Sequence, residues 1–489
     1  MKQGIEHAAR AVDNAVSLVA HVLGHVERLV DDVTRDSLAI ARESEALYRT
    51  VGVRAAGVRD AVRGAPRFWR IVTEAVKVVA SYRVYQARAN VAGPNADALA
   101  ALHARNAERM YELCVELRGG VLKLGQFVSS RVDLLPDAYI EQLGKLQDRV
   151  PAVPTEDIVA RIESELGRPV GEAFASFDSE PIAAASLAQV HGATLADGTR
   201  VAVKVQVPGI EDIIEIDMAA FRVIASALKD LMPAGDLEAI AIELSRSVRE
   251  ELDFEAEADH VEAFCGRFAG DDEVVVPHAY PELSSTRVLT LERLDGERLI
   301  DWLDAATQAE RDDLLATMLN CFCQQVLDHG VFHADPHPGN FLVLPGPRLG
   351  ILDFGAVQVF EPERQRAYAQ LATAILANDG ARTAALMSEV GFETRDGSPE
   401  TLARFADAFL DAFRESAGTL DLQNLDPRAE MEKAMRMARE YPIARIPQDF
   451  VLLGRVFASL GGLMLRYKPR IHLFAIIAPH LSRALRTAA

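Results

Sequence analysis

One stretch decides the fold of this chain, FHADPHPGNFLV at residues 332–343, and it is followed by LGILDFG at residues 349–355. Asp335 and Asn340 stand five residues apart, so a single loop can present a carboxylate and an amide. Asp353 comes 18 residues after Asp335, which is enough for a short hairpin that returns a second carboxylate to the same place. Because Mg²⁺ prefers oxygen ligands, we expect Asn340 and Asp353 to hold one magnesium ion beside Asp335.

The order of these residues is that of a kinase catalytic loop, in which H-x-D-x-x-x-x-N precedes an apolar strand and D-F-G. Asp335 would act on the attacking hydroxyl group or water, since phosphoryl transfer needs mainly a held metal nucleotide and a positioned nucleophile. The alternatives are a polar loop with satisfied hydrogen bonds, or a hydrolytic metal site made of His333, Asp335 and His337. Neither alternative explains Asn340 or the strand and D-F-G that follow.

The composition indicates a globular chain of two or three domains. Its 489 residues are 49% hydrophobic and 25% charged, which lets each domain bury its own core. A formal net charge of −20 argues against a nucleic-acid partner, because such binding depends on cations that neutralise phosphates. The four cysteines show no disulfide spacing, which is typical of a reducing cytosol.

Residues 1–93 have the apolar spacing of a helical arm. Its segment 49–90 carries nine basic residues against Asp60 and Glu74. A basic amphipathic helix can lie on an anionic membrane surface, which would make the protein cytoplasmic and peripheral at the inner face of the membrane. The same helix could instead pack on the catalytic domain with its arginines in water.

Residues 94–154 are predicted as a second helical segment, interrupted at Gly119-Gly120. Lys123 and Gln126 share one face of this helix because they are three residues apart, and Gly125 allows another backbone to approach. Alone, this pattern is typical of a solvated face. Near the other end of the chain, the apolar run 450–465 contains Arg455 and is predicted as a buried core helix rather than a membrane span.

Residues 155–294 begin with a predicted helix and continue as strand, hairpin and strand, the second strand ending in VAVK at 201–204. Lys204 stands where the phosphate-binding lysine of kinases follows its strand, although a lysine in an alternating strand is usually an exposed edge residue. In place of a glycine-rich loop the chain has Ala183, Ala184, Ala185 and Ser186. Each Cβ obstructs close approach to phosphate, so we expect nucleotide to be held differently and transfer to a bulky substrate to be poor.

Two further segments complete the predicted nucleotide site. Asp253 and Glu257 lie four residues apart in a strongly helical stretch, and like charges at this spacing need cationic partners. Lys204 is the expected partner of Glu257, as in kinases. Residues 287–294 are predicted as a strand running into a connector, where backbone groups from Glu292 to Leu294 would bind adenine.

Together these motifs resemble the UbiB-like atypical kinases, also called the AarF or ADCK family, over residues from about 95 to 360. The resemblance implies an α+β, protein-kinase-like two-lobe domain with an N-terminal helical extension and a mostly helical C-terminal region. The expected boundaries are a helical arm at 1–93, K-x-G-Q helices over the active site at 94–154, an N-lobe at 155–294 and a C-lobe at 295–489. After Gly355 we expect helices to the end of the chain.

The resemblance also implies roles for these residues. Lys204 would bind the phosphates of ATP or ADP and pair with Glu257, while Asn340 and Asp353 would hold Mg²⁺ and Asp335 would be the base. Lys123 and Gln126 would face Glu251 and Asp253 across the pocket.

The family is associated with ATP hydrolysis and with ubiquinone biosynthesis or isoprenoid-lipid handling at membranes. We therefore expect an atypical kinase or ATPase, with nucleotide and an anionic or isoprenoid lipid as partners. Two alternatives stay open. The H-x-D-x-H-x-x-N spacing is similar to that of aminoglycoside and choline kinases, which predicts a small-molecule phosphotransferase. A nucleotide-sensing scaffold without turnover is the other alternative.

Overall fold

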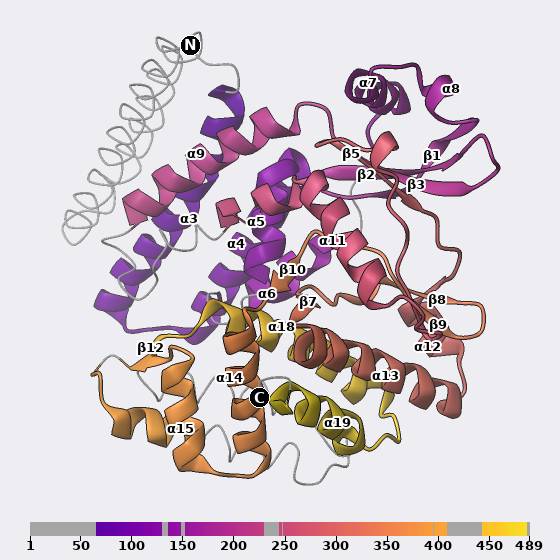
Figure 1. The fold of residues 1–489 in the computed structure, drawn as a ribbon. Helices are drawn as coiled ribbons and strands as arrows, with labels where there is room; N and C mark the ends of the chain where they lie inside the picture. The colour runs from indigo at the N-terminus through magenta and orange to yellow at the C-terminus, as the bar shows by residue number, and fades with distance from the viewer. Residues whose placement is uncertain are drawn as a thin grey trace. The chain divides into compact units, whose positions relative to one another are not determined.

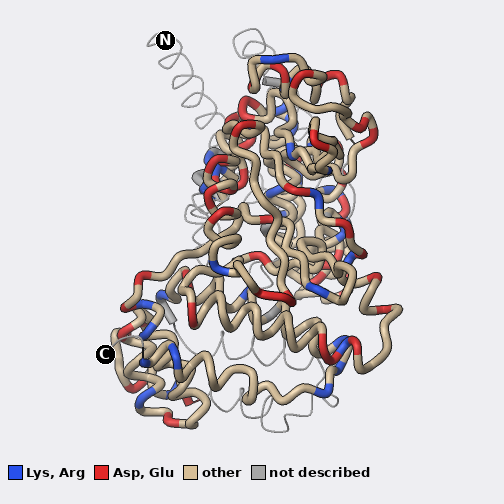
Figure 2. The backbone as a smooth tube through the Cα atoms, turned by 45° about the vertical axis from the view of Figure 1, so that its right-hand side comes forward, with Lys and Arg blue, Asp and Glu red and all other residues tan. Residues whose placement is uncertain are grey.

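The computed structural model describes residues 65–129, 135–147, 152–228, 244–246, 248–394, 396–407 and 443–486. The chain divides into two compact units: the first comprises 1–198 and 203–252, and the second comprises 199–202 and 253–489. Figure 1 shows helices and strands in both units. Acidic residues are spread over both rather than gathered in one place (Figure 2). The predicted boundaries at 93, 154 and 294 stay predictions.

The first unit is a group of helices followed by three strands. Its elements are α3 (Ala65–Ala92), α4 (Ala96–Leu117), α5 (Gly119–Ser129), α6 (Asp137–Gly144), η1 (Lys145–Gln147), α7 (Thr155–Leu166), α8 (Val170–Ala173), β1 (Ser176–Ala184), β2 (Ala188–Thr194), β3 (Arg200–Gln206) and α9 (Ile210–Leu228). The predicted interruption at Gly119-Gly120 is confirmed, because α4 ends at Leu117 and α5 begins at Gly119, which has a positive φ. The first predicted strand is β1, which already begins at Ser176.

The second unit contains the catalytic-loop sequence. Its elements are α11 (Phe254–Arg267), β4 (Val274–Val275), η2 (Pro281–Leu283), β5 (Val288–Glu292), β6 (Glu297–Arg298), α12 (Leu299–Ala305), α13 (Gln308–Cys323), η3 (Gln324–His329), β7 (Val331–His333), η4 (Pro338–Asn340), β8 (Phe341–Leu344), β9 (Arg348–Ile351), β10 (Val357–Val359), α14 (Pro362–Leu376), α15 (Gly380–Glu389), β11 (Glu393–Thr394), β12 (Ile443–Arg445), α18 (Gln448–Tyr467) and α19 (Leu473–Arg486). Short strands β10 to β12 correct the expectation of helices alone after Gly355.

Strand β3 lies inside its sheet. The sheet order is β1-β2-β3-β5, so β3 has a neighbour on each side. Val201, Val203 and Val205 are fully buried, and alternation along the strand directs Lys204 to the opposite face, where it is half-buried. The alternative of an exposed edge lysine is therefore excluded.

Helix α3 packs on the first unit through its apolar face. Ile71 and Val72 are buried in a core cluster that includes residues of α4, α5, α6 and α9, and Phe68, Trp69, Val76 and Val79 pack against it. Figure 1 shows α3 and α9 side by side. Because this face is covered by protein, it cannot also lie in a membrane surface. Residues 65–92 form a packed helix, but the helix packs on α4, α5, α6 and α9 of the first unit, and Arg67 is largely buried rather than in water. The rest of the predicted arm lies outside the described residues.

Helix α18 is the apolar stretch predicted as a buried core helix. Leu453, Val456 and Leu460 are buried at helical spacing, but Val451 on the opposite side is 37% exposed and Phe457, at the border of the buried face, is 64% exposed. The prediction is therefore right for one face only. Among the described residues, α18 is the helix whose length and composition would suffice to cross a membrane.

Candidate active site

The catalytic loop is held by its own hydrogen bonds between β7 and β8. The Asn340 side-chain amide donates from Nδ2 to the Asp335 carbonyl at 3.0 Å, and the His337 backbone amide donates to the same carbonyl at 2.7 Å. The Asn340 backbone amide donates to the His337 carbonyl at 2.9 Å. These bonds fix Asp335 and Asn340 relative to one another and leave the Asn340 amide oxygen as a potential metal ligand.

The predicted short hairpin is confirmed, and it returns Asp353 to the catalytic loop. Strands β8 and β9 pair antiparallel, and the Leu352 amide, just before Asp353, donates to the Asn340 carbonyl at 3.0 Å. Asp353 accepts the Gly355 amide on Oδ1 at 2.9 Å. A carboxylate, an amide and a second carboxylate therefore meet within one loop and its hairpin.

Glu257 of α11 belongs to the same group. A Cβ at Gly355 would lie 3.2 Å from Asp353 Oδ1 and 3.8 Å from Glu257 Oε2, so both carboxylates approach this glycine. Glu257 is only 2% exposed. A buried carboxylate and the carboxylate of Asp353 therefore both lie beside Gly355.

The helical reading of Asp253 and Glu257 needs correction. The helix is interrupted at Leu252, and Asp253 is the N-cap of α11, where its side chain accepts the Ala256 amide at 3.0 Å. An N-cap carboxylate satisfies an unpaired amide and interacts favourably with the helix dipole. Asp253 therefore needs no cationic partner, and the predicted repulsion on one helix face is wrong.

His333 is a buried side chain that supports the catalytic loop through a hydrogen bond. It is 1% exposed, and its Nδ1 accepts the Asp335 amide at 3.1 Å. Burial lowers the pKa of His333, although the nearby carboxylates of Asp353 and Asp335 oppose this change. Since Nδ1 accepts a hydrogen bond and burial disfavours the charge, His333 is neutral near pH 7 and acts as a fixed support.

Two further residues support this loop, and no sequence motif indicates either of them. Gln325, fully buried in the π-helical turn η3, accepts the His333 amide on Oε1 at 2.9 Å. Ser459 of α18 donates to the Pro336 carbonyl at 2.6 Å. Both bonds join segments that no local pattern connects, although π-helical turns are frequent near functional sites.

In the first unit, Lys123 of α5 forms an ion pair with Glu251. Gln126, one turn further, donates to the Leu146 carbonyl at 3.1 Å, so its amide supports packing. Gly125 is required between them, because a Cβ there would lie 2.5 Å from Leu146 Cδ1 and 2.8 Å from Cys114 Sγ. The close approach predicted at this glycine is real, but side chains rather than backbone make it.

The alanine-rich segment forms the turn between β1 and β2. Ala183 and Ala184 end β1, and the Ala185 amide donates to the Ala188 carbonyl at 2.8 Å. Ala183 and Ala185 are exposed. Ser186 is 6% exposed and the following Leu187 is in the core. The turn therefore presents methyl groups where a kinase has glycines.

The predicted adenine connector follows β5 in the second unit. The Glu292 amide donates to the His278 carbonyl at 2.7 Å, and the Arg293 amide donates to the Arg200 carbonyl at 3.0 Å. Both amides are therefore used within the protein.

The structure thus groups the predicted site residues in two sets. Asp335, Asn340, Asp353 and Glu257 lie together in the second unit, while Lys123 and Glu251 form a pair in the first. The pairing of Lys204 with Glu257 stays a prediction.

Comparisons with known proteins agree on one family. A family model described as "ABC1 atypical kinase-like domain" matches residues 145–387. The Arabidopsis thaliana "Protein ACTIVITY OF BC1 COMPLEX KINASE 8, chloroplastic" is 33% identical over 399 residues, which cover 75% of this chain and 52% of the relative. A protein of Synechocystis sp. is 34% identical over 367 residues, which cover 71% of this chain and 84% of that protein. Among solved structures, the Mycobacterium tuberculosis complex of Rv3197 with erythromycin has a TM-score of 0.55 at 26% identity, and covers 80% of this chain and 99% of that chain.

These similarities confirm the predicted fold, a kinase-like domain of mixed helices and sheets. The chain spans about half the length of the Arabidopsis relative but most of the Synechocystis protein. Another Arabidopsis relative, 34% identical over 390 residues, is named an aarF domain-containing protein kinase. The chain therefore belongs to the ABC1, or AarF, family of atypical kinase-like proteins.

Proposed function

We propose that this protein binds Mg–ATP and cleaves its terminal phosphate bond. One observation carries the proposal: the hydrogen-bonded loop that fixes Asp335 and Asn340, with Asp353 returned to it by the β8–β9 hairpin. Phosphoryl transfer depends on positioning and charge stabilisation rather than on covalent chemistry. A rigid loop with one base and two metal-binding groups supplies that positioning.

The roles follow from the chemistry of each side chain. Asn340 and Asp353 would hold Mg²⁺, which when bound neutralises charge on the transferred phosphoryl group. Asp335 would orient the attacking hydroxyl group or water and accept its proton. Lys204 would bind phosphate oxygens and pair with Glu257, and the connector from Glu292 to Leu294 would hold the adenine.

The alanine turn favours hydrolysis or a small acceptor over protein phosphorylation. The methyl groups of Ala183, Ala184 and Ala185 limit how closely the backbone can approach phosphate, and Ser186 is buried beneath them. With Lys123 and Gln126 as further members of the site, we infer an ATPase or atypical kinase that serves isoprenoid-quinone or other lipid metabolism at a membrane.

A second candidate is a phosphotransferase for a small molecule. It is favoured by the Mycobacterium tuberculosis neighbour, whose structure was solved with erythromycin. Such an enzyme would phosphorylate a hydroxyl group of the acceptor, so a mass increase of the acceptor separates it from an ATPase. A scaffold without turnover is separated by the absence of phosphate release.

Calorimetric binding of ATP with Mg²⁺ tests the proposed site. Wild type should bind, and Asp353→Asn should lose the magnesium-dependent part of the affinity because the amide replaces a charged ligand. Asp379→Asn is the matched control, since Asp379 is exposed and only caps α15, a role that Asn also fills. Equal binding by wild type and Asp353→Asn would contradict the assigned metal site.

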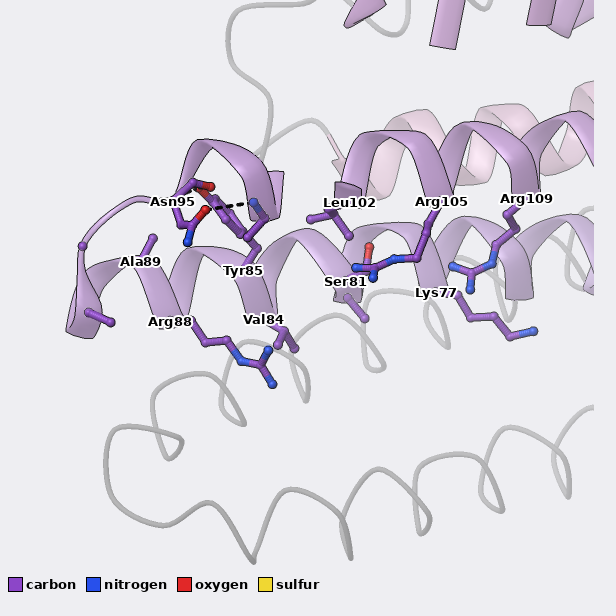
Figure 3. A pocket seen from close by; sticks show the side chains of 14 residues that line it. Lys77, Ser81, Val84, Tyr85, Arg88, Ala89, Asn95, Leu102, Arg105 and Arg109 are labelled. Atoms are coloured by element: carbon purple, nitrogen blue, oxygen red, sulfur yellow. Dashed lines mark hydrogen bonds between the residues drawn. The ribbon is translucent and has the colours of Figure 1, made fainter. Parts of the chain in front are cut away.

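A pocket between α3 and α4 supports an anionic membrane lipid as partner. It has a volume of about 730 Å³, and its lining includes four cations and no acid: Lys77, Arg88, Arg105 and Arg109. Ala80, Val84 and Leu102 give it apolar walls. Figure 3 shows Arg105 and Arg109 reaching from α4 toward α3. A phospholipid headgroup with its hydrocarbon chain matches this combination.

Part of this positive charge is already neutralised. Glu74 pairs with Lys77 at 2.7 Å and with Arg109 at 3.4 Å. Arg88 and Arg105 are exposed and supply the remaining charge at the pocket. We therefore expect these two arginines to decide lipid binding.

Flotation with vesicles tests the lipid partner. Wild type should float with phosphatidylglycerol vesicles and not with phosphatidylcholine vesicles, and its ATP turnover should rise with the former at low salt. Arg88→Glu/Arg105→Glu should abolish flotation. The control Arg348→Glu/Arg404→Glu changes the charge equally at exposed sites of the second unit and should still float. Equal flotation of both double variants would contradict the proposal that this pocket binds an anionic lipid.

A further inference from the structure

A buried ion pair joins helices α3 and α9 at the start of α5. Arg67 donates from Nε to Asp217 Oδ1 at 2.6 Å and from Nη2 to Oδ2 at 2.7 Å. The Asp217 side chain is fully buried and that of Arg67 is 17% exposed. Two parallel hydrogen bonds of this kind fix geometry as well as charge.

The same two side chains satisfy backbone groups at a helix break. Arg67 also donates from Nη1 to the Leu117 carbonyl at 2.6 Å and from Nη2 to the Arg118 carbonyl at 2.9 Å, where α4 ends. Asp217 Oδ2 accepts the Val121 amide at 3.1 Å, in the first turn of α5. Helix ends leave such carbonyls and amides without intrahelical partners. One ion pair therefore forms hydrogen bonds to the last carbonyls of α4 and to a first-turn amide of α5.

Glycines at the break make room for this arrangement. A Cβ at Gly120 would lie 3.0 Å from Asp217 Oδ2, and one at Gly119 would lie 2.8 Å from a methyl group of Ile213. Gly119 also has a φ of +59°, which favours glycine. Burial raises the pKa of Asp217, while Arg67 and the amides of Val121 and Gly120 oppose that rise.

Helix α5 is held in a fixed position from this point onward. Lys123 comes two residues after Val121 and forms its ion pair with Glu251. Gly125, two residues further, is wedged against Leu146 and Cys114. Asp217 fixes the start of α5 and packing at Gly125 fixes its middle. Together they set the orientation of the helix, and with it the direction of the Lys123 side chain.

We propose that the Arg67–Asp217 pair is the positioning device of the K-x-G-Q helix, holding α5 so that Lys123 meets Glu251. Neither residue needs to touch nucleotide for this role. The inference rests on the proposed function insofar as Lys123 belongs to the nucleotide site. It predicts that the pair controls the turnover number more than the affinity for ATP.

A neighbouring pair on α3 provides the matched control. Arg70, one helical turn from Arg67, pairs with Glu116 at 2.8 Å and also with Glu74. Its side chain is 40% exposed and makes no hydrogen bond to α5 among the described residues. The exposed pair with Glu116 contributes little, and Glu74, which is 7% exposed, keeps Lys77 and Arg109 as partners. Arg70→Met should therefore leave both melting temperature and turnover close to wild type.

The decisive comparison uses single and double apolar variants. Arg67→Met and Asp217→Leu each leave one buried charge unpaired, so each should lower the melting temperature. The double variant Arg67→Met/Asp217→Leu removes both charges, and its melting temperature should recover most of the loss. Its kcat for ATP should nevertheless stay about 10-fold or more below wild type, with KM little changed, because the start of α5 is no longer held.

Hydrogen exchange gives a readout that needs no activity. The amides of 119–129 should exchange faster in the double variant than in wild type and in Arg70→Met, although the global stability is restored. If wild type turns over no ATP, the proposed function fails while this exchange test still decides the role of the pair.

Arg67→Lys is the conservative variant. Its ammonium keeps the charge but cannot span the carboxylate and both carbonyls, so we expect melting close to wild type with reduced kcat and faster exchange over 119–129. The double variant could instead recover its wild-type kcat and its wild-type exchange over 119–129 together with its melting temperature. That result would show that the pair is merely structural and would overturn the proposal.

Discussion

The catalytic loop of the second unit and helix α5 of the first hold their polar side chains by different means. In the loop, hydrogen bonds to Asn340 and His333 fix Asp335. In α5, Lys123 is set by close packing at Gly125 and by an ion pair at the helix start. The loop therefore depends on particular donors and acceptors throughout, whereas α5 depends on them at its start and on the absence of side-chain volume at Gly125.

This difference explains why one region keeps a kinase pattern and the other departs from it. Hydrogen-bonded positions demand particular residues at fixed spacing, so the catalytic loop is readable as a motif. Positions fixed by packing accept any sequence with the right volumes. We therefore expect the loop to lose activity when a hydrogen-bonding group is removed, and α5 to lose stability when side-chain volume is added.

The largest effect is expected for Asn340→Ala in the catalytic loop. The variant loses both the amide oxygen that we propose as a metal ligand and the hydrogen bond to the Asp335 carbonyl. A misplacement near 1 Å can cost about 10²-fold in rate. Steady-state ATP turnover measures the loss. Asn90→Ala, at an exposed site on α3, is the control and should keep the wild-type rate. A rate within a few-fold of wild type for Asn340→Ala would mean that this loop is not the catalytic one.

In α5, the corresponding test adds volume instead of removing a donor. Gly125→Ala places a methyl group 2.5 Å from Leu146 Cδ1, and overpacking of this kind costs about 1–3 kcal/mol of unfolding free energy. Denaturant unfolding measures it. Gly144→Ala is the control, because nothing lies within 4 Å of a Cβ there and Ala is favoured over Gly in helices. If both variants unfold at the same denaturant concentration, packing does not fix α5.

Substitutions in the alanine turn should affect ATP affinity and stability separately. Ala183→Gly and Ala184→Gly remove a methyl group each and should change ATP affinity by a few-fold or allow some autophosphorylation. The accompanying loss of stability should be about 0.5–1 kcal/mol, the cost of added backbone freedom. Isothermal calorimetry and a phosphate-incorporation assay measure the two outcomes. Unchanged affinity without autophosphorylation would show that the turn does not touch phosphate.

The smallest expected effect is the pH dependence contributed by His333. Burial lowers the pKa of His333 below its ordinary value of 6.5, so below that pH the unfolded chain binds a proton that the folded loop excludes. Stability should then fall as the pH drops through 6.5, by at most about 1.4 kcal/mol per pH unit.

His333→Asn isolates this contribution, because the amide oxygen can replace Nδ1 as the acceptor for the Asp335 amide. Unfolding free energies at pH 7.5 and pH 5.5 should differ less in the variant than in wild type. Equal differences would mean that His333 titrates freely in the folded loop.

Local patterns predicted the parts of the site that are close in sequence. The hairpin that returns Asp353 to Asn340 follows from spacing, and the strand of Lys204 follows from alternating valines. The sequence also indicated the breaks at Gly93 and Gly119. These features depend on neighbours within about 20 residues, which a single sequence contains.

The misses have a common physical cause. The apolar period predicts a continuous helix through Asp253, because it does not show that the chain leaves the helix at Leu252 and that Asp253 caps a new one. Arg67 and Asp217 are 150 residues apart, and Ser459 reaches Pro336 from 123 residues away. Such contacts arise from tertiary packing, which no local pattern encodes.

The most direct test of the catalytic-loop assignment is phosphate release from ATP by wild type and Asp335→Asn with Mg²⁺. We predict that wild type releases phosphate, that a chelator stops it, and that Asp335→Asn is slower by about 10²–10⁴-fold, the contribution of a positioned base. Equal rates for the two proteins, both bound to Mg–ATP, would contradict the role given to Asp335.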